Sequence, residues 1–315
     1  MRIVSFLPSA TEMVYALGLG DQLVGVTHEC DYPSGAKSKP VVVRSAVDTK
    51  GLSSQQIDES VSLMLKAGQS LYTVDESLLQ EVAPDLILTQ DLCQVCAPSG
   101  HEINRVLQFL LKSPQIVYLT PNCLEDIFDN IRQVGEATNR ASVADDLVRR
   151  LRTRVQAVSD HARLVSSRPR VFCMEWLSPP YTAGHWMPEL VELAGGVDGL
   201  GRKGHDSVRV SWERIVEYAP DVLILTPCGF DLEEVLRQAH LLTTFPGWER
   251  LPAIERDRVY AVDANSYFAR PGPRVVEGLE LLAHIIHPDR FTWYGPPEAY
   301  RSLPAVDLAG IAAKR

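Results

Sequence analysis

Two cysteines three positions apart, Cys93 and Cys96, have the spacing that most directly suggests chemistry in this sequence. They follow the apolar run at residues 85–89, close to Asp91 and just before a Pro-Ser-Gly turn. A Cys-x-x-Cys pair can supply two ligands to a metal, form a redox-active disulfide, or line a pocket as free thiols. The surrounding sequence has to distinguish these three roles.

A closed zinc site needs four ligands, so this pair would require two more from elsewhere in the chain. His28 and Cys30, in the motif THECDYP, are the obvious source because they follow another predicted strand of the same half. A thioredoxin-like redox pair is disfavoured by Asp91, since a neighbouring carboxylate raises the pKa of a thiol. We favour thiols or a disulfide that shape or line a pocket, and the metal and redox alternatives stay open.

The composition is that of a globular protein without a nucleic-acid partner. The 315 residues are 45% hydrophobic and 23% charged, and 31 Lys and Arg against 40 Asp and Glu give a formal charge of -9. A chain with this charge and no visible basic stripe is not expected to bind a polyanion. Six cysteines in a chain of this length do not form a disulfide framework, and they fit cytosolic thiols.

The amino terminus bears on the cellular compartment. Met1 leads directly into a strand-like run that Pro8 ends, which leaves no room for the apolar stretch of a signal peptide. No later stretch reaches the roughly 18 apolar residues that a membrane helix needs, so direct membrane insertion is not expected. We expect a cytoplasmic protein as the sequence is written, and a periplasmic or extracellular one if the start is trimmed or misassigned.

Strand-like and helix-like runs alternate along the chain, which is typical of parallel α/β units. Strands are predicted at residues 3–7, 23–26, 85–89, 116–119, 170–174, 221–226 and 258–262, and amphipathic helices at residues 11–19 and 124–137. Asp85 and Asp221 follow prolines at strand starts and are expected to cap turns. The alternation predicts an α/β fold of mainly parallel sheets flanked by helices.

Two segments of the first half recur in the second half. SLLQEVAPDLILTQ at 77–90 parallels ERIVEYAPDVLILTP at 213–227, and RIVSFLPSATEMVYALG at 2–18 has a counterpart within 170–196. A helix, an Ala-Pro-Asp turn and a buried strand also form a common α/β unit, but two echoes in the same order favour two similar lobes. Residues 142–165 lie between the halves and predict one amphipathic helix of about 36 Å.

These patterns predict two lobes bridged by one long helix, with a ligand between the lobes. The expected divisions are an N-terminal lobe over 1–140, a bridging helix over 141–166, a C-terminal lobe over 167–291, and a C-terminal strap or tail over 292–315.

With these residues in view, the segment SFLPSATEMVYALGLGDQLVGVTHECDYP resembles the helix-bridged (class III) substrate-binding proteins of ABC transporters, which take cobalamin, haem and ferric siderophores. The segments TVDESLLQEVAPDLILTQDLCQVC, PYTAGHWMPELVELAGG, SWERIVEYAPDVLIL and FARPGPRVVEGLELLA match in the same order, from Met1 to about Pro288. THECDYP and DLCQVC are most similar to the cobalamin-binding branch.

The resemblance implies a protein without catalytic activity or catalytic cofactor that binds a corrinoid, either cobalamin or a precursor, in the cleft between the lobes. Siderophore or haem binding is one alternative, and a cytosolic metal or redox protein using Cys93 and Cys96 is another. No Ser-His-Asp order, phosphate loop or paired-carboxylate motif stands out, so no catalytic residue is assigned.

The resemblance also implies an ABC permease partner, to which such proteins offer one Glu from each lobe. Glu213, seven residues before Pro220, matches this position in the second lobe. In the first lobe the matching position is Ser77, and Glu76 is shifted by one residue. The first-lobe contact therefore departs from the family pattern.

Ligands of open α/β sheets bind beyond the carboxyl ends of the strands. Ser9 and Glu12 form a capping-box pattern there, and a helix start of this kind can contact the polar edge of a ligand. A flat, partly apolar macrocycle favours several aromatic rings and a few polar groups. The expected ligand-binding residues are Pro8, Ser9, Thr11, His28, Cys30, Asp91, Cys93, Cys96, Trp176, Tyr181, His185, Trp186, His205, Tyr267, Phe268 and Arg270. Because the bridging helix resists large hinge motion, we expect a small closure, with the aromatic residues and the cysteine loop on opposite sides of the ligand.

Overall fold

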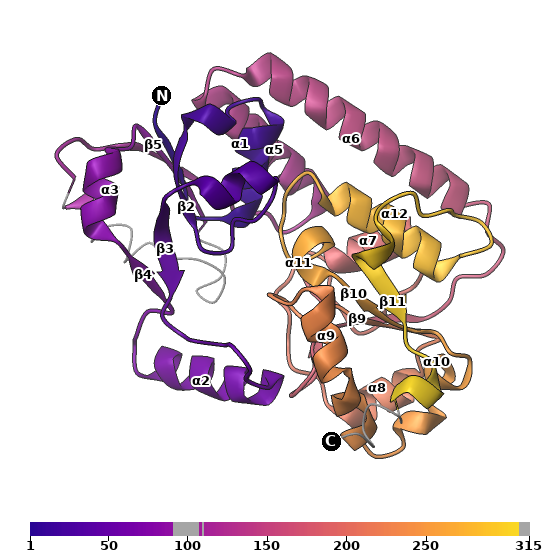
Figure 1. The fold of residues 1–315 in the computed structure, drawn as a ribbon. Helices are drawn as coiled ribbons and strands as arrows, with labels where there is room; N and C mark the ends of the chain where they lie inside the picture. Colours follow the sequence, from indigo (N-terminus) through magenta and orange to yellow (C-terminus); the bar gives the residue numbers. More distant parts are fainter. Residues whose placement is uncertain (91–106, 109, 309–315) are drawn as a thin grey trace. The chain divides into compact units, whose positions relative to one another are not determined.

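The computed structural model describes residues 1–90, 107–108 and 110–308, which divide into two compact units (Figure 1). The first lobe comprises Met1–Leu52, Gln56–Pro121 and Glu125–Arg150. The second lobe comprises Leu151 onward together with the short segments Ser53–Gln55 and Asn122–Leu124. Each lobe contains a mainly parallel sheet with helices around it, which confirms the predicted fold class.

The described part of the first lobe contains a six-stranded sheet in the order β4-β3-β2-β1-β5-β6. All neighbouring strands are parallel except β3 and β4. The strands are β1 (Ile3–Ser5), β2 (Leu23–Thr27), β3 (Val41–Ser45), β4 (Tyr72–Val74), β5 (Leu86–Thr89) and β6 (Gln115–Tyr118). The helices are α1 (Pro8–Ala16), α2 (Ser54–Lys66), α3 (Glu76–Val82) and α5 (Leu124–Ala137), with the 3-10 turns η1 (Gly20–Gln22) and η2 (Ser34–Ser38).

Five strands form the sheet in the described residues of the second lobe, in the order β11-β10-β9-β7-β8. The central pairs β7–β9 and β9–β10 are parallel, and both outer strands run antiparallel to their neighbours. The strands are β7 (Val171–Trp176), β8 (Tyr181–Thr182), β9 (Val222–Leu225), β10 (Val259–Val262) and β11 (Tyr300–Ser302). The helices are α7 (Met187–Leu193), α8 (Trp212–Tyr218), α9 (Leu232–Gln238), α10 (Pro252–Glu255), α11 (Ala264–Tyr267) and α12 (Val275–Ile286), with η3 (Ala239–Thr244), η4 (Trp248–Arg250) and η5 (Pro297–Ala299).

The central strands of both sheets are largely apolar because helices cover both faces of a parallel sheet. β5 and β9 are buried at every position, so neither strand shows the alternating pattern of a half-exposed sheet. In the first lobe, β1, β3 and β5 join α3 in one core cluster. Its buried members are Val4, Phe6, Val42, Val43, Leu79, Val82 and Ile87.

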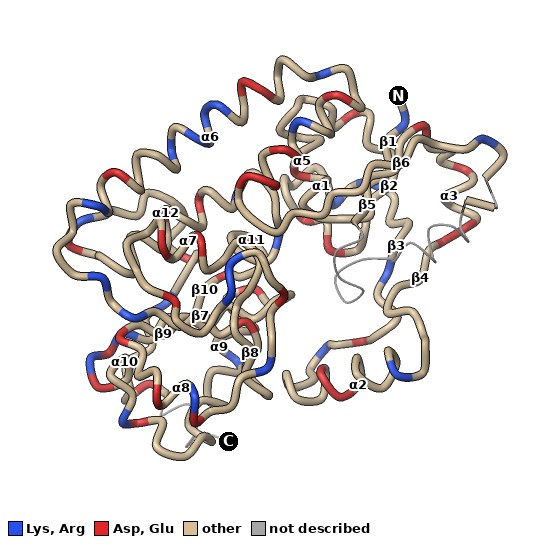
Figure 2. Tube along the Cα trace, turned by 180° about the vertical axis from the view of Figure 1, so that it is seen from behind, with Lys and Arg blue, Asp and Glu red and all other residues tan. Residues whose placement is uncertain are grey.

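The helix α6 (Ala141–Ala162) passes from one lobe to the other, since the boundary between the two units falls after Arg150. It is the long helix predicted at 142–165, and it ends a few residues earlier than expected. The charges on its exposed side are grouped along the helix, with Asp145 and Asp146 first, then a run of arginines from Arg149 to Arg152, and then Asp160 (Figure 2). Within the second lobe, Arg154 donates to both carboxylate oxygens of Glu280 in α12, at 2.8 and 2.7 Å. This two-bond contact fixes the C-terminal half of α6 to the second lobe.

The predicted capping box at the start of α1 is wrong. The helix begins at Pro8, and its N-cap is Leu7, whose side chain makes no capping bond. Proline suits the first helical position because its φ is already helical and its missing N–H has no partner there. The helix therefore starts before Ser9, which is left inside the first turn and buried.

The repeated Ala-Pro-Asp segments fold alike in the two lobes. α3 and α8 each have seven residues and begin with a side-chain cap, from Asp75 and Ser211 respectively. Each ends at an alanine in the left-handed region, Ala83 at φ 36° and Ala219 at φ 49°. The echo in the sequence is thus a repeated helix, turn and strand.

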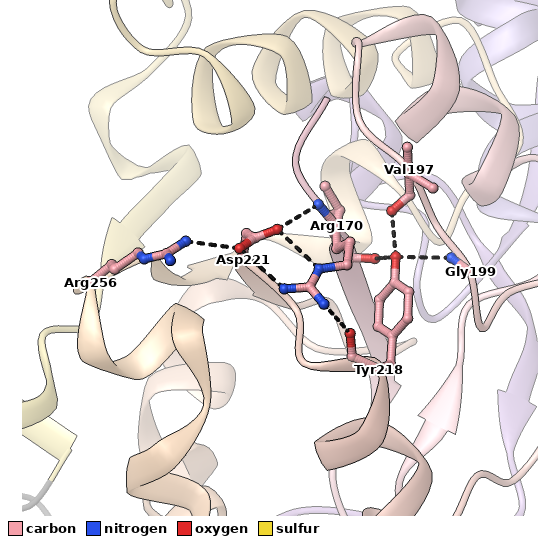
Figure 3. Close-up of polar contacts among 7 residues, drawn as sticks. Arg170, Val197, Gly199, Tyr218, Asp221 and Arg256 are labelled. Carbon is pink, nitrogen blue, oxygen red and sulfur yellow. Dashed lines mark hydrogen bonds and ion pairs between the residues drawn. The ribbon is translucent and has the colours of Figure 1, made fainter. Parts of the chain in front are cut away.

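Polar contacts hold this unit in the second lobe (Figure 3). Asp221 accepts a hydrogen bond from the backbone N–H of Arg170, at 3.0 Å, and binds the guanidinium groups of Arg170 and Arg256. The Arg170 guanidinium also donates to the carbonyl of Tyr218, the last residue of α8, at 3.1 Å. One arginine therefore joins the start of β7 to the start of β9 and the end of α8.

The first lobe repeats this arrangement with Arg2 in place of Arg170. Asp85 accepts from the backbone N–H of Arg2 at 2.9 Å and from Lys112 at 2.8 Å. The Arg2 side chain donates to the carbonyl of Val82, the last residue of α3, at 2.6 Å. Each aspartate thus accepts a hydrogen bond from the residue that precedes the neighbouring strand, Arg2 before β1 and Arg170 before β7. Each also follows a proline at a strand start, as the sequence indicated.

Replacing Asp221 with Asn should lower the free energy of unfolding at pH 7 by about 2 kcal/mol, because hydrogen bonds to a charged acceptor are lost. Burial raises the pKa of Asp221, but the bonds from Arg170 and Arg256 outweigh it and hold the pKa below its ordinary value of 3.8. The ionised side chain therefore stabilises the fold above about pH 4, and this contribution is lost as the pH falls through the lowered folded-state pKa. Urea unfolding at pH 7 and pH 3.5 should show the difference between wild type and Asp221→Asn shrinking at the lower pH. Asp289→Asn, at an exposed aspartate, is the matched control; an equal loss in both variants would contradict the expectation.

Candidate functional site

The carboxyl ends of β1, β2 and β5 lie at one edge of the first sheet because these strands are parallel. Pro8, Ser9 and Thr11 follow β1 within α1, while His28 and Cys30 follow β2. The predicted residues Asp91, Cys93 and Cys96 follow β5 and lie outside the described residues. This sheet edge brings the described first-lobe candidates together, as the sequence predicted from strand order.

The Cys30 thiol lies in the interior of the lobe. Its sulfur is 3.1 Å from the Thr11 hydroxyl and 3.3 Å from the Thr27 hydroxyl, and the residue is 4% exposed. His28 is accessible, with 30% of its side chain exposed and its Nε2 4.0 Å from the Glu29 carboxylate. Among the described residues, no group of three or more His, Cys, Asp and Glu side chains is arranged to hold a metal ion.

Two polar groups at the end of β5 were missed by the sequence reasoning. The Thr89 hydroxyl and the Gln90 amide nitrogen are buried, and within the described chain neither has a hydrogen-bond partner. A buried donor without a partner costs about 1–3 kcal/mol, so native proteins supply one from a ligand, an ordered water or another part of the chain. Gln90 therefore joins the candidates, and its position directly after an apolar strand was the available signal.

In the second lobe, a row of side chains crosses the carboxyl end of β7. Trp176 pairs with Tyr181 across β7 and β8, and Tyr181 pairs in turn with Arg209. Directly opposite residues of neighbouring strands place their side chains on the same face. Phe230, after β9, lies next to Trp176 with ring centroids 5.2 Å apart. We call Phe230, Trp176 and Tyr181 the aromatic row.

Polar contacts fix the orientation of the aromatic row. The Arg209 guanidinium donates through Nε to the Tyr181 hydroxyl at 2.8 Å and lies 5.7 Å from the centre of the ring. The Trp176 indole donates to the carbonyl of Ser54, at 3.0 Å, in the segment Ser53–Gln55 that groups with this lobe. Trp176 and Tyr181 are half-buried, so part of each ring remains accessible. Phe230 was missed from the sequence, although the internal repeat places 227–230 after β9 as it places Gln90 after β5.

Four other candidates lie inside the second lobe. Trp186 and Phe268 are buried, and the Trp186 indole donates to the Phe268 carbonyl at 3.0 Å. Tyr267 and Arg270 are buried as well, and burial, together with Glu277 and Asp263, raises the pKa of Tyr267 to about 12. These residues connect the segment after β7 to the segment after β10. They are part of the interior of the lobe.

His185 adopts the left-handed conformation, with φ 52°, in the turn before α7. Its backbone exchanges hydrogen bonds with the loop, donating to the His205 carbonyl at 2.7 Å and accepting from Gly204 at 2.9 Å. Its Nε2 is 3.3 Å from Asp206, within ion-pair distance but without hydrogen-bond alignment. Burial lowers the pKa of His185 against the opposing effect of Asp206, so the ring is neutral at pH 7. His205 is exposed on the same loop.

The two expected docking residues lie at helix starts. Glu213 is exposed in the first turn of α8, and Glu76 is half-buried in the first turn of α3. Because α3 and α8 have the same length between their N-caps Asp75 and Ser211, Ser77 and not Glu76 is the counterpart of Glu213. Successive residues of a helix point about 100° apart, so the two carboxylates leave their helices in different directions.

Known proteins resemble this chain over most of its length. An uncharacterized ABC transporter substrate-binding lipoprotein of Bacillus subtilis, YvrC, is 28% identical over 298 residues, covering 92% of this chain and 81% of the relative. A vitamin B12-binding protein of Vibrio cholerae is 25% identical over 285 residues, 89% of this chain and 87% of the relative.

Solved structures share the fold. A periplasmic vitamin B12 binding protein of Vibrio cholerae matches with a TM-score of 0.66 at 24% identity, covering 90% of this chain and 96% of that one. A periplasmic heme binding protein of Pseudomonas aeruginosa matches with a TM-score of 0.72 at 18% identity, covering 94% and 96%. The sequence profile of the periplasmic binding proteins matches residues 3–266, and the chain therefore belongs to the periplasmic binding protein family.

Proposed function

We propose that this protein is the substrate-binding component of an ABC importer and holds a corrinoid, either cobalamin or a precursor. The aromatic row is the observation that carries the proposal. A corrin ring is flat and largely apolar on its faces, and rings of this kind favour aromatic surfaces flanked by a few polar groups. The vitamin B12-binding relatives support the same ligand class.

In the second lobe, the aromatic row and His205 would contact the ligand. In the first lobe, the candidate contacts are His28 and the start of α1, together with Cys93 and Cys96, which lie outside the described residues. The Gln90 amide would donate to oxygen atoms at the periphery of the ligand, which gives this buried donor its partner.

Haem and ferric siderophores are the alternatives that the same surface could accept. Proteins named for heme or iron binding share the fold at 18% and 24% identity, as does the vitamin B12 binding protein at 24%. The aromatic row suits any flat macrocycle, so the ligand has to be distinguished by direct binding.

Incubation with cyanocobalamin, cobinamide, haem or a ferric siderophore, followed by desalting and a visible absorption spectrum, tests the proposal. We expect the corrinoids to be retained at about one per chain and the other two to be lost. The protein unfolded in urea is the control for non-specific retention. Retention of haem or the siderophore alone would replace the corrinoid as ligand, and a colourless protein in every case would overturn the proposed function.

We further propose that the protein works outside the cytoplasmic membrane and docks to a permease through Glu213 and Glu76. The named relatives are a lipoprotein and a family of periplasmic proteins, so the cytoplasmic location expected from the sequence finds no support among them. No helix of the described chain is both long and apolar enough to span a bilayer. The shifted first-lobe carboxylate would require a permease whose cationic group approaches α3 from a different direction than α8.

A further inference from the structure

We propose that Glu175 is a positioning residue that holds the segment 197–210 in the conformation that a ligand of the second lobe requires. The proposal rests on the proposed function for its ligand, but its structural part can be tested without one. Glu175 lies at the carboxyl end of β7, where the register between β7 and β8 shifts between Met174 and Trp176. Glu175 is thus the extra residue of a β-bulge, a feature that redirects a side chain out of the regular alternation.

The redirected carboxylate joins separate loops. One oxygen accepts a hydrogen bond from the Ser207 hydroxyl at 2.6 Å, and the other accepts from the backbone N–H of Gly184 at 3.4 Å. The Glu175 carbonyl also accepts from the backbone N–H of Cys228 at 3.1 Å. A single residue therefore connects the segments that follow β7 and β9 with the loop before α8.

The two ends of segment 197–210 have their own anchors. At its start, the Tyr218 hydroxyl donates to the Val197 carbonyl at 2.6 Å and accepts from Gly199 at 3.0 Å (Figure 3). At its end, Val208 accepts from Thr182 at 2.9 Å. The middle of the segment is largely exposed, and there the bond of Ser207 to Glu175 supplements the backbone contacts with His185.

The position of this segment determines the orientation of Tyr181, the residue at one end of the aromatic row. Arg209 belongs to the segment, and its guanidinium orients the Tyr181 hydroxyl. His205 and the partner of His185, Asp206, belong to it as well. Displacement of Ser207 would move all of these groups, although Glu175 itself need not touch the ligand.

Gly184 shows how closely the segment packs against the turn. A Cβ atom added at Gly184 would lie 2.4 Å from the His205 carbonyl oxygen and 2.6 Å from the Ser207 nitrogen. Both neighbours are backbone atoms, so a side chain would have to displace the segment. Gly184→Ala should therefore displace segment 197–210 without altering Glu175, and it provides a second variant that tests the position of this segment.

Hydrogen exchange measured by mass spectrometry tests the structural part in the ligand-free protein. In Glu175→Ala, the amides of 199–210 should exchange about tenfold faster or more, because two bonds to a charged acceptor are lost. Glu175→Gln keeps the shape and one acceptor, since the Ser207 hydroxyl can rotate to accept from its amide, and should restore most of the protection. Ser207→Ala should give an intermediate effect. Glu249→Ala, which removes an exposed carboxylate of the same lobe, is the control.

Cyanocobalamin binding tests the functional part. Glu175→Ala and Gly184→Ala should both raise the Kd about tenfold, because only the fraction of molecules with an ordered segment binds. Saturating cyanocobalamin should then restore protection of 199–210 in Glu175→Ala, a result that general destabilisation does not produce.

The outcomes separate this proposal from the proposed function. Unchanged exchange of 199–210 in Glu175→Ala would overturn the positioning role whatever the ligand. Faster exchange without ligand-dependent recovery, in a protein that does bind cyanocobalamin, would show that the segment lies away from the ligand and would overturn the functional part. If wild type binds no tetrapyrrole, the proposed function fails and the functional part of this proposal fails with it. The exchange result still decides whether Glu175 holds segment 197–210 in place.

Discussion

Alanine in place of Trp176 is expected to weaken corrinoid binding by about thirtyfold, ~2 kcal/mol, as for a central aromatic contact of a binding surface. Trp176 lies between Phe230 and Tyr181, so its removal takes the middle of the aromatic row away. Trp176→Phe keeps an aromatic face but loses the N–H bonded to the Ser54 carbonyl. It should retain most of the affinity if the ring provides the contact.

Absorption titration with cyanocobalamin measures this effect for each variant. Trp248→Ala, which removes a half-buried indole of η4 outside the candidate site, is the matched control and should bind as wild type does. An affinity of Trp176→Ala equal to that of the control would remove the aromatic row from the site.

The second large effect concerns stability. Trp186→Ala should reduce the free energy of unfolding by about 4 kcal/mol, because a buried indole is replaced by a cavity. The indole also donates to the Phe268 carbonyl, so the substitution leaves a buried acceptor without its donor. Trp186→Phe, which keeps most of the ring volume, should lose about 1–2 kcal/mol for that bond and some packing.

Urea unfolding followed by circular dichroism measures these differences. Leu164→Ala is the control, since its side chain is 80% exposed and should change stability by less than about 0.5 kcal/mol. A loss for Trp186→Ala no larger than that of the control would show that Trp186 is not part of the core. It would then return to the list of residues available to a ligand.

The sequence alone determined the fold class and most of the sheet core. Buried parallel strands need apolar residues on both faces, so β5 and β9 appear as continuous runs that follow a Pro-Asp start. Apolar residues at helical spacing located α6 in the same way, because one face of this helix is buried. The sequence did not locate β3, β4, β8 or β11. The last three have only two or three residues and lie at or near a sheet edge, where burial does not impose a continuous apolar run; β3 has five residues and was missed as well.

The start of α1 shows where local patterns compete. Ser9 and Glu12 match a capping box, yet Pro8 begins the helix because its backbone angle is already helical. Both signals are visible in the sequence, and only the folded backbone decides between them.

The candidate site was found in part from the sequence, because parallel strands bring the segments that follow them to one edge of a sheet. That rule selected Trp176, Tyr181, Trp186 and Phe268 without distinguishing their roles. Trp176 and Tyr181 share the aromatic row, while Trp186 and Phe268 are buried in the lobe. The tertiary structure decides this because the direction of a side chain depends on cross-strand register. The bulge at Glu175 changes that register by one residue, and no local sequence pattern records the strand that lies opposite.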